Sequence, residues 1–404
     1  MAGGLRASRR QDYGAAVSLF ERAAALVPPT GRDLALEIEF EMPLIWTGRG
    51  EEALRRADAL AERAAASGDR VGELCGRIRG AVLRLESGGG PDHLEALVQE
   101  AVPVFEAAGE DLALYIAYDA LASVADMRGR EEATLEALER AWAHAARAGH
   151  QPPGIVGMRA SLRFFGPTPV VELLAWLDEN EPPAGRDHFL RAYRAGALGM
   201  LGRFDEARAI LADTRAELEE RGPGILLANI TAFESVWVEL WAGEPAAAAE
   251  FAEAGWRQHE ALGEHSFMRG AAHSRARTSL ALDRLDDADA WLVRAAELGA
   301  STGWVWWRMR WGSLRAELLS RRGEHAEAER LAREAATMCE ETDMLDAQGD
   351  VHAGLGEVLL RAERATEAAE ALKQALARFE TKGNVVMAGR MRERLAALKP
   401  PTVA

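Results

Sequence analysis

Residues 201–211 read LGRFDEARAIL, and this stretch decides the fold. A glycine turn leads into an acidic pair, followed by a small side chain at Ala207 and a large apolar one at Leu211. Residues four apart lie on one face of a helix, so the stretch predicts a turn that enters an amphipathic helix. Related stretches, TGRGEEA at 47–53 and RRGEHAEA at 321–328, occur elsewhere. The chain is therefore built from repeats.

The repeat has a period of about 40 residues, which is in the range of helical-repeat arrays. Each unit contains two segments with helical spacing of apolar residues, joined by a glycine turn, and no segment alternates with the period of two that a strand needs. A lone helical hairpin cannot bury both of its apolar sides, so neighbouring units must stack. We expect an all-α fold, an α-α superhelix of about ten helical hairpins. We place the marker of the second helix at Ala16, Ala53, Ala96, Ala133, Val171, Ala207, Ala248, Ala288, Ala328 and Ala368.

Two further features fit helical hairpins. A small side chain stands seven residues before the turn, at Ala195, Ala276, Ala316 and Gly356, where it lets the two helices approach closely. The second segment tends to end on a glycine, as at Gly68, Gly109, Gly149, Gly263 and Gly383, because glycine adopts the left-handed conformation that ends a helix.

The small marker followed four residues later by a large apolar side chain, as in Ala207 and Leu211, resembles the tetratricopeptide repeat in a lengthened form. The closing stretch, residues 359–395, resembles the C-terminal repeat region of bacterial multidomain signalling proteins. Those proteins carry an adenylate/guanylate cyclase module, an AAA ATPase module, or both, and large ATP-dependent transcriptional activators are built similarly. The resemblance implies a regulatory arm that binds other proteins.

Charge and composition exclude several classes of protein. Acidic residues outnumber basic ones 64 to 48, and the net charge of −16 opposes general attraction to nucleic acids or anionic membranes. We find neither an apolar run long enough for a membrane span nor a secretory signal, which predicts a cytoplasmic protein. Cys75 and Cys339 stand alone, and we expect both to be buried thiols.

No pattern predicts an enzyme. The chain has no phosphate-binding G-x-x-x-x-G-K-[ST] loop and no nucleophile-elbow motif. The stretch HEALGEH, His259 to His265, invites a metal interpretation, but a glycine at the i+4 position ends the helix between the two histidines. We expect a polar helix end there. We assign no catalytic residue, no cofactor and no metal.

We divide the chain into four parts. Residues 1–11 form a disordered or partial N-terminal segment, too short and polar to pair with the helix that follows. Residues 12–399 form a single repeat array, in which 384–398 is a capping helix that turns Arg390, Arg392 and Arg394 toward water. Residues 400–404 form a tail. Because the first repeat begins in mid-unit, we expect the array to have once continued upstream into an effector that is either lost or separately encoded.

Four tryptophans lie in STGWVWWRMRW, residues 301–311. At 100° per residue, Trp304, Trp307 and Trp311 fall in one narrow arc that predicts helix packing. Trp306 lies with Arg310 on a face that neither apolar arc of the helix uses. Projection of this face onto the neighbouring repeats, one repeat period at a time, predicts a concave groove with aromatic, cationic and anionic side chains. Its candidate residues are Phe233, Trp237, His273, Arg277, Trp306, Arg310 and Asp350.

Alternatives stay open at this point. Trp306 either lines a groove or covers the side chains of a neighbouring repeat. The groove suits an extended peptide or partner helix, which makes the chain a non-catalytic scaffold, or a planar anionic small molecule. The basic run from Arg308 to Arg322 either binds nucleic acid, as in a transcription regulator, or is a solvated helix face, which the acidic surroundings favour.

Overall fold

The computed structural model describes residues 1–9, 12–27, 33–85, 89–152, 154–181, 187–263, 267–299 and 303–398. Within these ranges the chain is helical and contains no strand, so the predicted all-α fold is confirmed. The helices are α1 (Ala2–Arg9), α2 (Tyr13–Ala24), α3 (Leu34–Trp46), α4 (Gly50–Ser67), α5 (Arg70–Leu85), α6 (Pro91–Ala108), α7 (Asp111–Met127), α8 (Glu131–Arg147), α9 (Ile155–Phe165), α10 (Val170–Glu179), α11 (His188–Met200), α12 (Phe204–Glu219), α13 (Ile225–Ala232), α14 (Glu234–Ala242), α15 (Pro245–Leu262), α16 (Met268–Ala281), α17 (Leu285–Gly299), α18 (Val305–Arg321), α19 (His325–Cys339), α20 (Leu345–Arg361), α21 (Ala365–Lys382) and α22 (Val385–Ala397).

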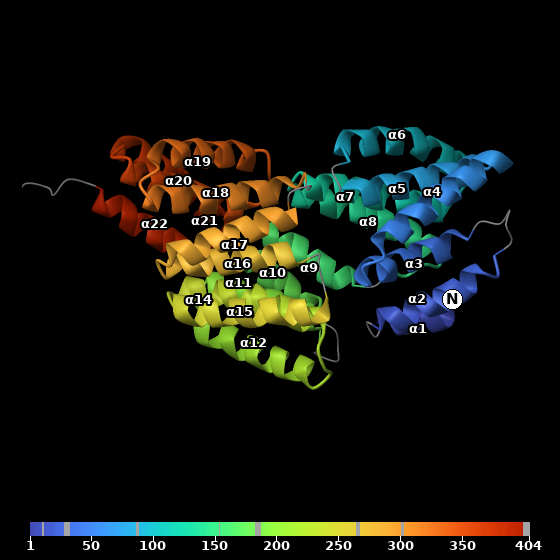
Figure 1. Ribbon diagram of the computed structural model, residues 1–404, viewed down its shortest axis with the longest axis horizontal. Coiled ribbons are helices and arrows are strands. Elements are labelled where there is room, and N and C mark those ends of the chain that lie inside the picture. Colours follow the sequence, from blue (N-terminus) through green and yellow to red (C-terminus); the bar gives the residue numbers. More distant parts are fainter. Residues whose placement is uncertain are drawn as a thin grey trace, which may run out of the picture. The chain divides into compact units, whose positions relative to one another are not determined.

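The chain divides into two compact units (Figure 1). Unit 1 comprises 1–127, 133–155 and 301–303, and unit 2 comprises 128–132, 156–300 and 304–404. Successive helices pack in pairs within each unit, such as α4 with α5 in unit 1 and α18 with α19 in unit 2. All of the predicted groove residues belong to unit 2.

The N-terminal segment differs from the expectation. Residues 2–9 form α1, which packs against α2, although the sequence analysis had judged this segment too short and polar to pair. Leu5 and Ala7 join the apolar cluster around Phe20, and Arg6 between them is exposed. These apolar contacts therefore pack the short helix against α2. Residues 10 and 11, and the tail 400–404, lie outside the described residues.

The helix markers are correct for seven repeats and misplaced for three. Seven markers are buried, each with 4% exposure or less: Ala16, Ala53, Ala207, Ala248, Ala288, Ala328 and Ala368. By contrast Ala96, Ala133 and Val171 are exposed. The buried positions there are Leu94, Thr134 and Leu173, the fourth residue of α6, α8 and α10, as Ala207 is of α12. The search for alanine failed because larger side chains take the same place.

The turn chemistry follows the sequence. Gly68, Gly109, Gly263 and Gly383 each follow a helix end with positive φ, as predicted. A Cβ at Gly356 would lie 2.8 Å from the Leu372 side chain, so only glycine allows α20 to approach α21 this closely. The small residues before the turns therefore set the spacing within the hairpins.

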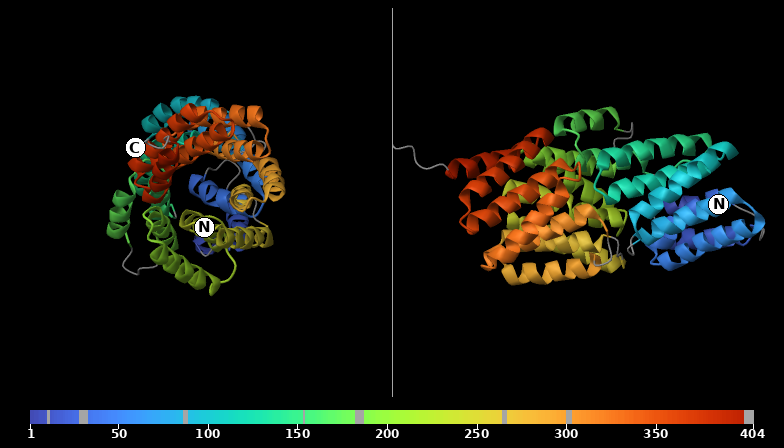
Figure 2. Two further views of the ribbon diagram at one scale, coloured as in Figure 1. Left: turned by 90° about the vertical axis from the view of Figure 1, so that its left-hand side faces the viewer. Right: turned by 90° about the horizontal axis from the view of Figure 1, so that it is seen from above.

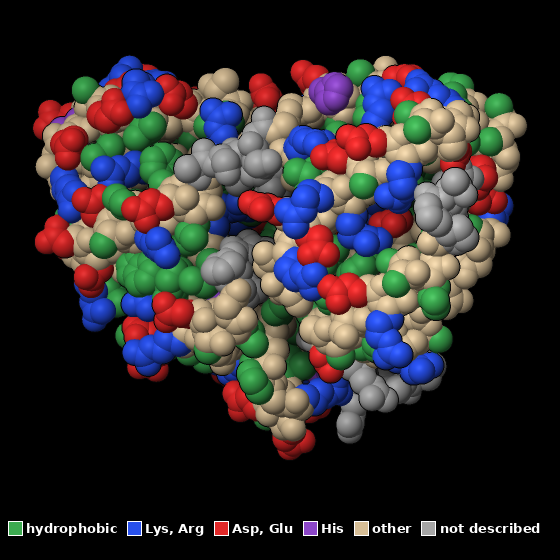
Figure 3. All heavy atoms as spheres, turned by 45° about the vertical axis from the view of Figure 1, so that its right-hand side comes forward, with side chains coloured by type: hydrophobic (Ala, Val, Ile, Leu, Met, Phe, Trp, Pro, Cys, Tyr) green, Lys and Arg blue, Asp and Glu red, His purple; other side chains and the backbone are tan. Residues whose placement is uncertain are grey.

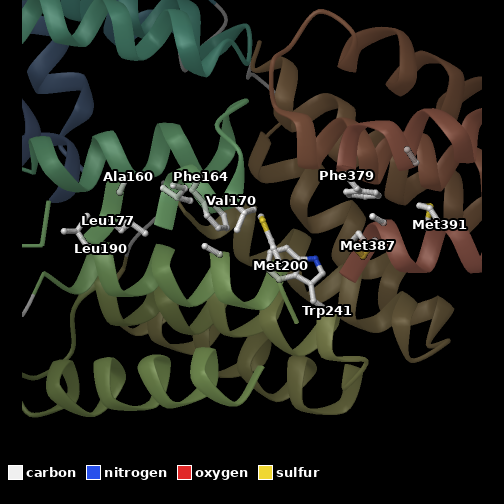
Figure 4. Close-up of a cluster of buried hydrophobic side chains, with 14 of the residues drawn as sticks. Ala160, Phe164, Val170, Leu177, Leu190, Met200, Trp241, Phe379, Met387 and Met391 are labelled. Carbon is white, nitrogen blue, oxygen red and sulfur yellow. The ribbon is translucent and has the colours of Figure 1, made fainter. Parts of the chain in front are cut away.

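Unit 2 closes on itself. Figure 2 shows its helices following one another from α9 and α10 round to α21 and α22, which return beside α9, α10 and α11. One apolar cluster joins the two ends of the array (Figure 4), with Phe164 and Val170 from its beginning and Phe379, Met387 and Met391 from its end. The last repeat of unit 2 thus packs against the first.

Polar contacts complete the closure. The fully buried Lys382 Nζ donates hydrogen bonds to the backbone oxygens of Arg163, Gly166 and Thr168, at 3.0, 2.7 and 2.8 Å. Burial lowers the pKa of this ammonium group to about 8. All three of its protons have acceptors, which is the condition for burying such a group.

The capping helix α22 lies near its predicted position, but one of its arginines was misassigned. Arg392 and Arg394 are exposed, as expected. Arg390 is half-buried and donates to the carbonyl oxygens of Leu240 and Trp241, at 3.2 and 2.8 Å. The carbonyl oxygens at the C-terminal end of α14 carry the negative end of the helix dipole and attract the guanidinium group. Closure therefore gives a polar residue of the cap a partner from the middle of the chain.

Among the described residues, one stretch, Ile225–Ala242, is long and apolar enough to cross a membrane. This stretch was not predicted from the sequence, because polar residues interrupt its apolar run. The stretch spans α13 and α14, which are separated at Phe233, and 67% of it is buried inside the protein. These are properties of core helices.

Replacing Lys382 by methionine tests the closure. The variant keeps the length of the side chain but leaves three carbonyl oxygens without their donor, and we expect it to lower the free energy of unfolding by roughly 2–4 kcal/mol. Urea denaturation measures the change. Lys373→Met, at an exposed position of the same helix, is the control and should change stability by about 0.5 kcal/mol at most. Equal losses in the two variants would contradict the role of Lys382.

Candidate functional site

The tryptophans in and just before α18 differ in burial. Trp307 is in the core, as the helical wheel predicts. Its side chain is buried, at 5% exposure, in a cluster with Trp256 and Ala295. Trp311 is half-buried and donates from Nε1 to the carbonyl oxygen of Leu292 at 3.0 Å. Trp304 is also half-buried, at the N-terminal end of the helix. The predicted packing arc thus contains one fully buried indole and two indoles at its edge.

Trp306 combines both interpretations left open by the sequence. Its ring packs edge-on against Trp304, with ring centroids 6.0 Å apart, and the Arg269 guanidinium lies 5.8 Å from its centroid. It also contacts the apolar cluster of Met309 and Met344, yet it remains half-buried. Trp306 therefore covers neighbouring side chains with one face and keeps part of its surface accessible.

The central feature of the candidate site is an ion pair between two non-adjacent repeats. Arg277 on α16 and Asp350 on α20 lie 3.0 Å apart, across the intervening helix α18. Only strong curvature of the array brings side chains of alternate repeats into contact. About a quarter of each side chain stays exposed, 26% for Arg277 and 25% for Asp350. We call the side of unit 2 toward which these residues point its inner face.

Further charged groups converge at the same place. Arg310 on α18 and Arg390 on α22 interact electrostatically with both Arg277 and Asp350. Asp346, one turn before Asp350, accepts a hydrogen bond from Asn384 Nδ2 at 2.7 Å. Burial and the neighbouring Asp350 raise the pKa of Asp346 to about 6. Burial lowers the pKa of Arg310, since its charge is partly removed from water.

His273 lies beside this cluster as a neutral side chain. Its ring is 5.9 Å from the Trp307 ring, and its Nε2 is buried without a hydrogen-bond partner. Burial, reinforced by the positive charges of Arg310 and Arg277, lowers the pKa of His273 to about 3. The His273 side chain is therefore uncharged at physiological pH and adds no positive charge to the site.

The aromatic part of the predicted groove lies at the beginning of unit 2. Trp237 stacks on Phe233, with ring centroids 6.1 Å apart, and meets Phe165 edge-on at 5.7 Å. Phe165 also contacts the apolar cluster that includes Trp306. Tyr193 packs edge-on against Phe165 and is half-buried. Phe165 thus links the two tryptophans that the sequence assigned to one groove.

The structure brings His273, Arg277, Arg310 and Asp350 together. It stacks Phe233 on Trp237 and links Trp237 to Trp306 through Phe165 and the apolar cluster that Phe165 and Trp306 both contact. All seven predicted residues are half-buried. Whether they bind a partner stays a prediction. The sequence analysis missed Arg390 and Phe165. Arg390 was detectable, because it follows Asp350 by the same repeat period that separates Asp350 from Arg310. Phe165 was not, since its repeat departs from that period.

One cluster within the described ranges has the residue types of a metal site. The possible ligand atoms of Cys339, Glu340 and His352 lie within 4.8 Å of one another. Burial raises the pKa of the Cys339 thiol to about 12. Glu340 accepts a hydrogen bond from Arg378 at 2.7 Å and lies 2.7 Å from His352 Nε2. These groups already form a hydrogen-bonded junction between helices. The expected burial of Cys75 and Cys339 is confirmed.

Two other patterns from the sequence have structural explanations. Helix α15 ends at Leu262 and is followed by the left-handed Gly263, as predicted, and His259 is fully buried. His265 lies outside the described residues. In the basic run, Arg315 and Arg322 both pair with Asp289, and Arg321 pairs with Glu317. Most of these positive charges are therefore neutralised by acidic neighbours.

Comparison with known proteins identifies the fold. No family model and no curated protein sequence matches the chain. Among solved structures, a Rap protein complexed with Competence and Sporulation Factor is similar with a TM-score of 0.50 and 11% identity, over 90% of this chain and 97% of that one. A human IFIT1 dimer with m7Gppp-AAAA is similar with a TM-score of 0.51 and 13% identity, over 98% and 88% of the two chains.

These structures are tetratricopeptide-repeat proteins, and the protein described here has their fold, as the sequence predicted. A signal-transduction ATPase with a tetratricopeptide-repeat sensor from Pyrococcus horikoshii is similar over 75% of this chain and 49% of that one, with 13% identity. The TM-score of this pair is 0.43. Similarity to these solved structures thus defines the fold. The function has to be inferred from the residues of this chain.

The two neighbouring indoles of α18 should respond differently to truncation. Trp307→Ala removes a buried ring and should lower the free energy of unfolding by about 3–5 kcal/mol. Trp306→Ala removes a half-buried ring and should cost less than half as much. Chemical denaturation of both variants measures the difference. Similar losses would place Trp306 in the core and remove it from the site.

The neutral state of His273 predicts part of the acid sensitivity. A histidine in an unfolded chain has a pKa near 6.5. Below that pH the ring of His273 is protonated in the unfolded chain, whereas in the folded protein it stays neutral down to about pH 3. Stability from this group is complete above pH 6.5 and falls with decreasing pH, by up to about 1.4 kcal/mol per pH unit.

We expect His273→Gln to flatten the decrease in unfolding free energy between pH 6.5 and 4, measured by urea denaturation. The variant of an exposed histidine, His325→Gln, is the control and should follow the wild-type curve. NMR titration of the His273 ring gives an independent measurement. A ring that titrates near pH 6.5 would show that His273 is solvated.

Proposed function

We propose that the protein is a non-catalytic helical-repeat scaffold whose inner face in unit 2 binds a peptide segment of a protein partner. The convergence of half-buried aromatic and charged side chains from α14, α16, α18 and α20 supports this proposal. Aromatic rings with part of their surface free, beside charged groups, are typical of protein-binding surfaces. The Rap–peptide complex supports the proposal as an example of the same fold with a bound peptide.

The wider context is also a proposal. The resemblance of residues 359–395 to bacterial signalling proteins supports a role as the sensing arm of a cytoplasmic ATPase or cyclase system. In that role, the peptide or protein bound by unit 2 is the signal, and catalysis belongs to another module. Co-purification with an ATPase or cyclase encoded beside this chain is the test.

A small-molecule sensor is the second candidate, and one observation favours it. The Arg269 guanidinium lies close to the rings of both Trp306 and Trp307, at 5.8 and 5.4 Å from their centroids. An aromatic ring beside an arginine suits a planar anionic ligand. A thermal-shift screen with nucleotides and aromatic acids distinguishes this candidate, since a ligand raises the unfolding temperature.

A nucleic-acid regulator is the third candidate, and it has less support. The arginines between Arg308 and Arg322 are largely paired with carboxylates. On the face shown in Figure 3, basic and acidic side chains are interspersed. Titration with oligonucleotides at rising salt tests this candidate, because phosphate contacts weaken steeply with salt.

The peptide-binding proposal predicts the behaviour of a double variant. Peptides are first selected from a random phage-displayed dodecapeptide library on the wild-type protein. Trp306→Ala combined with Arg310→Ala should weaken their binding at least about tenfold, since it removes an aromatic and a charged contact together. Fluorescence anisotropy measures the affinity, and far-UV circular dichroism verifies the fold.

Arg330→Ala is the matched control, because Arg330 is an exposed arginine on α19, the second helix of the same hairpin. It should bind the selected peptides like the wild type. If the double variant is folded and binds with unchanged affinity, the binding site lies elsewhere. A library that yields no binder argues against peptide recognition.

A further inference from the structure

The charged groups of the inner face are not fully paired. Arg277 pairs with Asp350, and Arg390 donates to backbone carbonyls at the end of α14. Asp346 accepts from Asn384. Within the described ranges, Arg310 has neither an ion-pair partner nor a hydrogen-bond partner for its side chain, and its Nε is buried. A guanidinium group that is half removed from water without a bonded anion is costly.

Three arginines of the inner face share Asp350 as an electrostatic partner. Arg277, Arg310 and Arg390 all interact with this carboxylate, whereas Asp346, Glu131 and Glu393 each act on only one or two of the three arginines. The nearby carboxylates Glu317 and Glu357 are already paired with Arg321 and Arg394. His273 is neutral. Asp350 is thus the one of these carboxylates that acts on all three arginines.

The Arg277–Asp350 pair is able to exchange its partner. Both side chains keep about a quarter of their surface accessible, so an incoming group reaches them without unfolding a helix. Asp350 is then an internal competitor for the cation that an external anion would bind. Arg310 lies between the two, on the helix that their ion pair crosses.

The surroundings of the arginines favour a peptide carboxylate as the anion. Trp306 lies one helical turn before Arg310 on the same face, and the rings of Trp237 and Phe165 continue the aromatic surface. In an extended peptide, an acidic side chain and a neighbouring apolar one are able to contact the two parts of such a face. Free phosphate would use the arginines and leave the rings uncovered.

We propose that the inner face of unit 2 recognises an acidic peptide segment, whose carboxylate binds Arg310 and competes with Asp350 for Arg277. This inference rests on the proposed peptide-binding function and adds the charge of the ligand. It assigns Arg310 as the anion receptor and Asp350 as the residue that limits affinity. Asp350 thereby sets a threshold against weakly acidic or neutral segments.

The test uses dodecapeptides selected from a random phage-displayed library on the full-length wild-type protein. Their sequences should be enriched in Asp and Glu relative to the unselected library. For the tightest peptide, Arg310→Gln should weaken binding about tenfold, the effect of one charge-assisted hydrogen bond. Asp350→Asn should tighten it severalfold. Such a gain cannot come from misfolding, so the proposal remains testable even if Arg310→Gln is unstable.

Two controls isolate the charge. Arg330→Gln, on an exposed surface, should bind like the wild type. A peptide with its acidic residues replaced by amides should bind wild type and Arg310→Gln equally, which closes a double-mutant cycle. Neutral or basic peptides that still depend on Trp306 would overturn this inference and leave the proposed function standing. If Asp350→Asn fails to tighten binding, its role as a competitor is refuted, and selected peptides that ignore both Trp306 and Arg310 contradict the two proposals together.

Discussion

The closure of unit 2 is the constraint on which its functional surface depends. Lys382 is placed among three carbonyl oxygens near the beginning of the array, and the apolar cluster of Phe164, Phe379 and Met391 seals the same junction. An open solenoid has freedom in the angle between successive repeats. Joining the last repeat to the first removes this freedom, because the angles between successive hairpins must then add up to one closed ring. The curvature of unit 2 is thereby fixed.

Curvature, in turn, determines the chemistry of the inner face. Side chains on the first helices of the repeats point toward one another, so Arg277 meets Asp350 across α18. Charges that would be separate on a flat array become neighbours with strongly shifted pKa values, as for His273 and Asp346. Electrostatic interactions at such distances, away from bulk water, are stronger than on the outer surface. Among the residues that the structure describes, none forms a hydrogen bond or ion pair with the Arg310 side chain, and this gives the face its selectivity in our proposal.

The comparison of sequence and structure shows where reasoning from repeats succeeds. The hairpins, the glycine helix ends and the buried markers at positions such as Ala207 and Ala288 follow from local periodicity, because each feature is decided within one or two turns of helix. The markers at Ala96, Ala133 and Val171 were wrong, since burial selects a position in the helix and accepts Leu94, Thr134 or Leu173 there.

The residues that share the face of the candidate site were predictable for the same reason. Their contacts with distant parts of the chain were not. A step of one repeat period correctly related Arg310 to Asp350, and one further step reaches Arg390. The sequence nevertheless predicts that Arg390 faces water, because nothing within its own helix indicates the carbonyl groups of Leu240 and Trp241. Partners 150 residues away along the chain exist only after closure.

The sequence by itself determined the helices, the period of the hairpins and the residues that share one side of successive repeats, because these depend on interactions within a few residues of the chain. The tertiary structure alone decided that unit 2 closes, how tightly it curves, and which charges on its inner face find partners. A small change in the angle between neighbouring hairpins accumulates over the array, and local sequence patterns leave that angle undetermined.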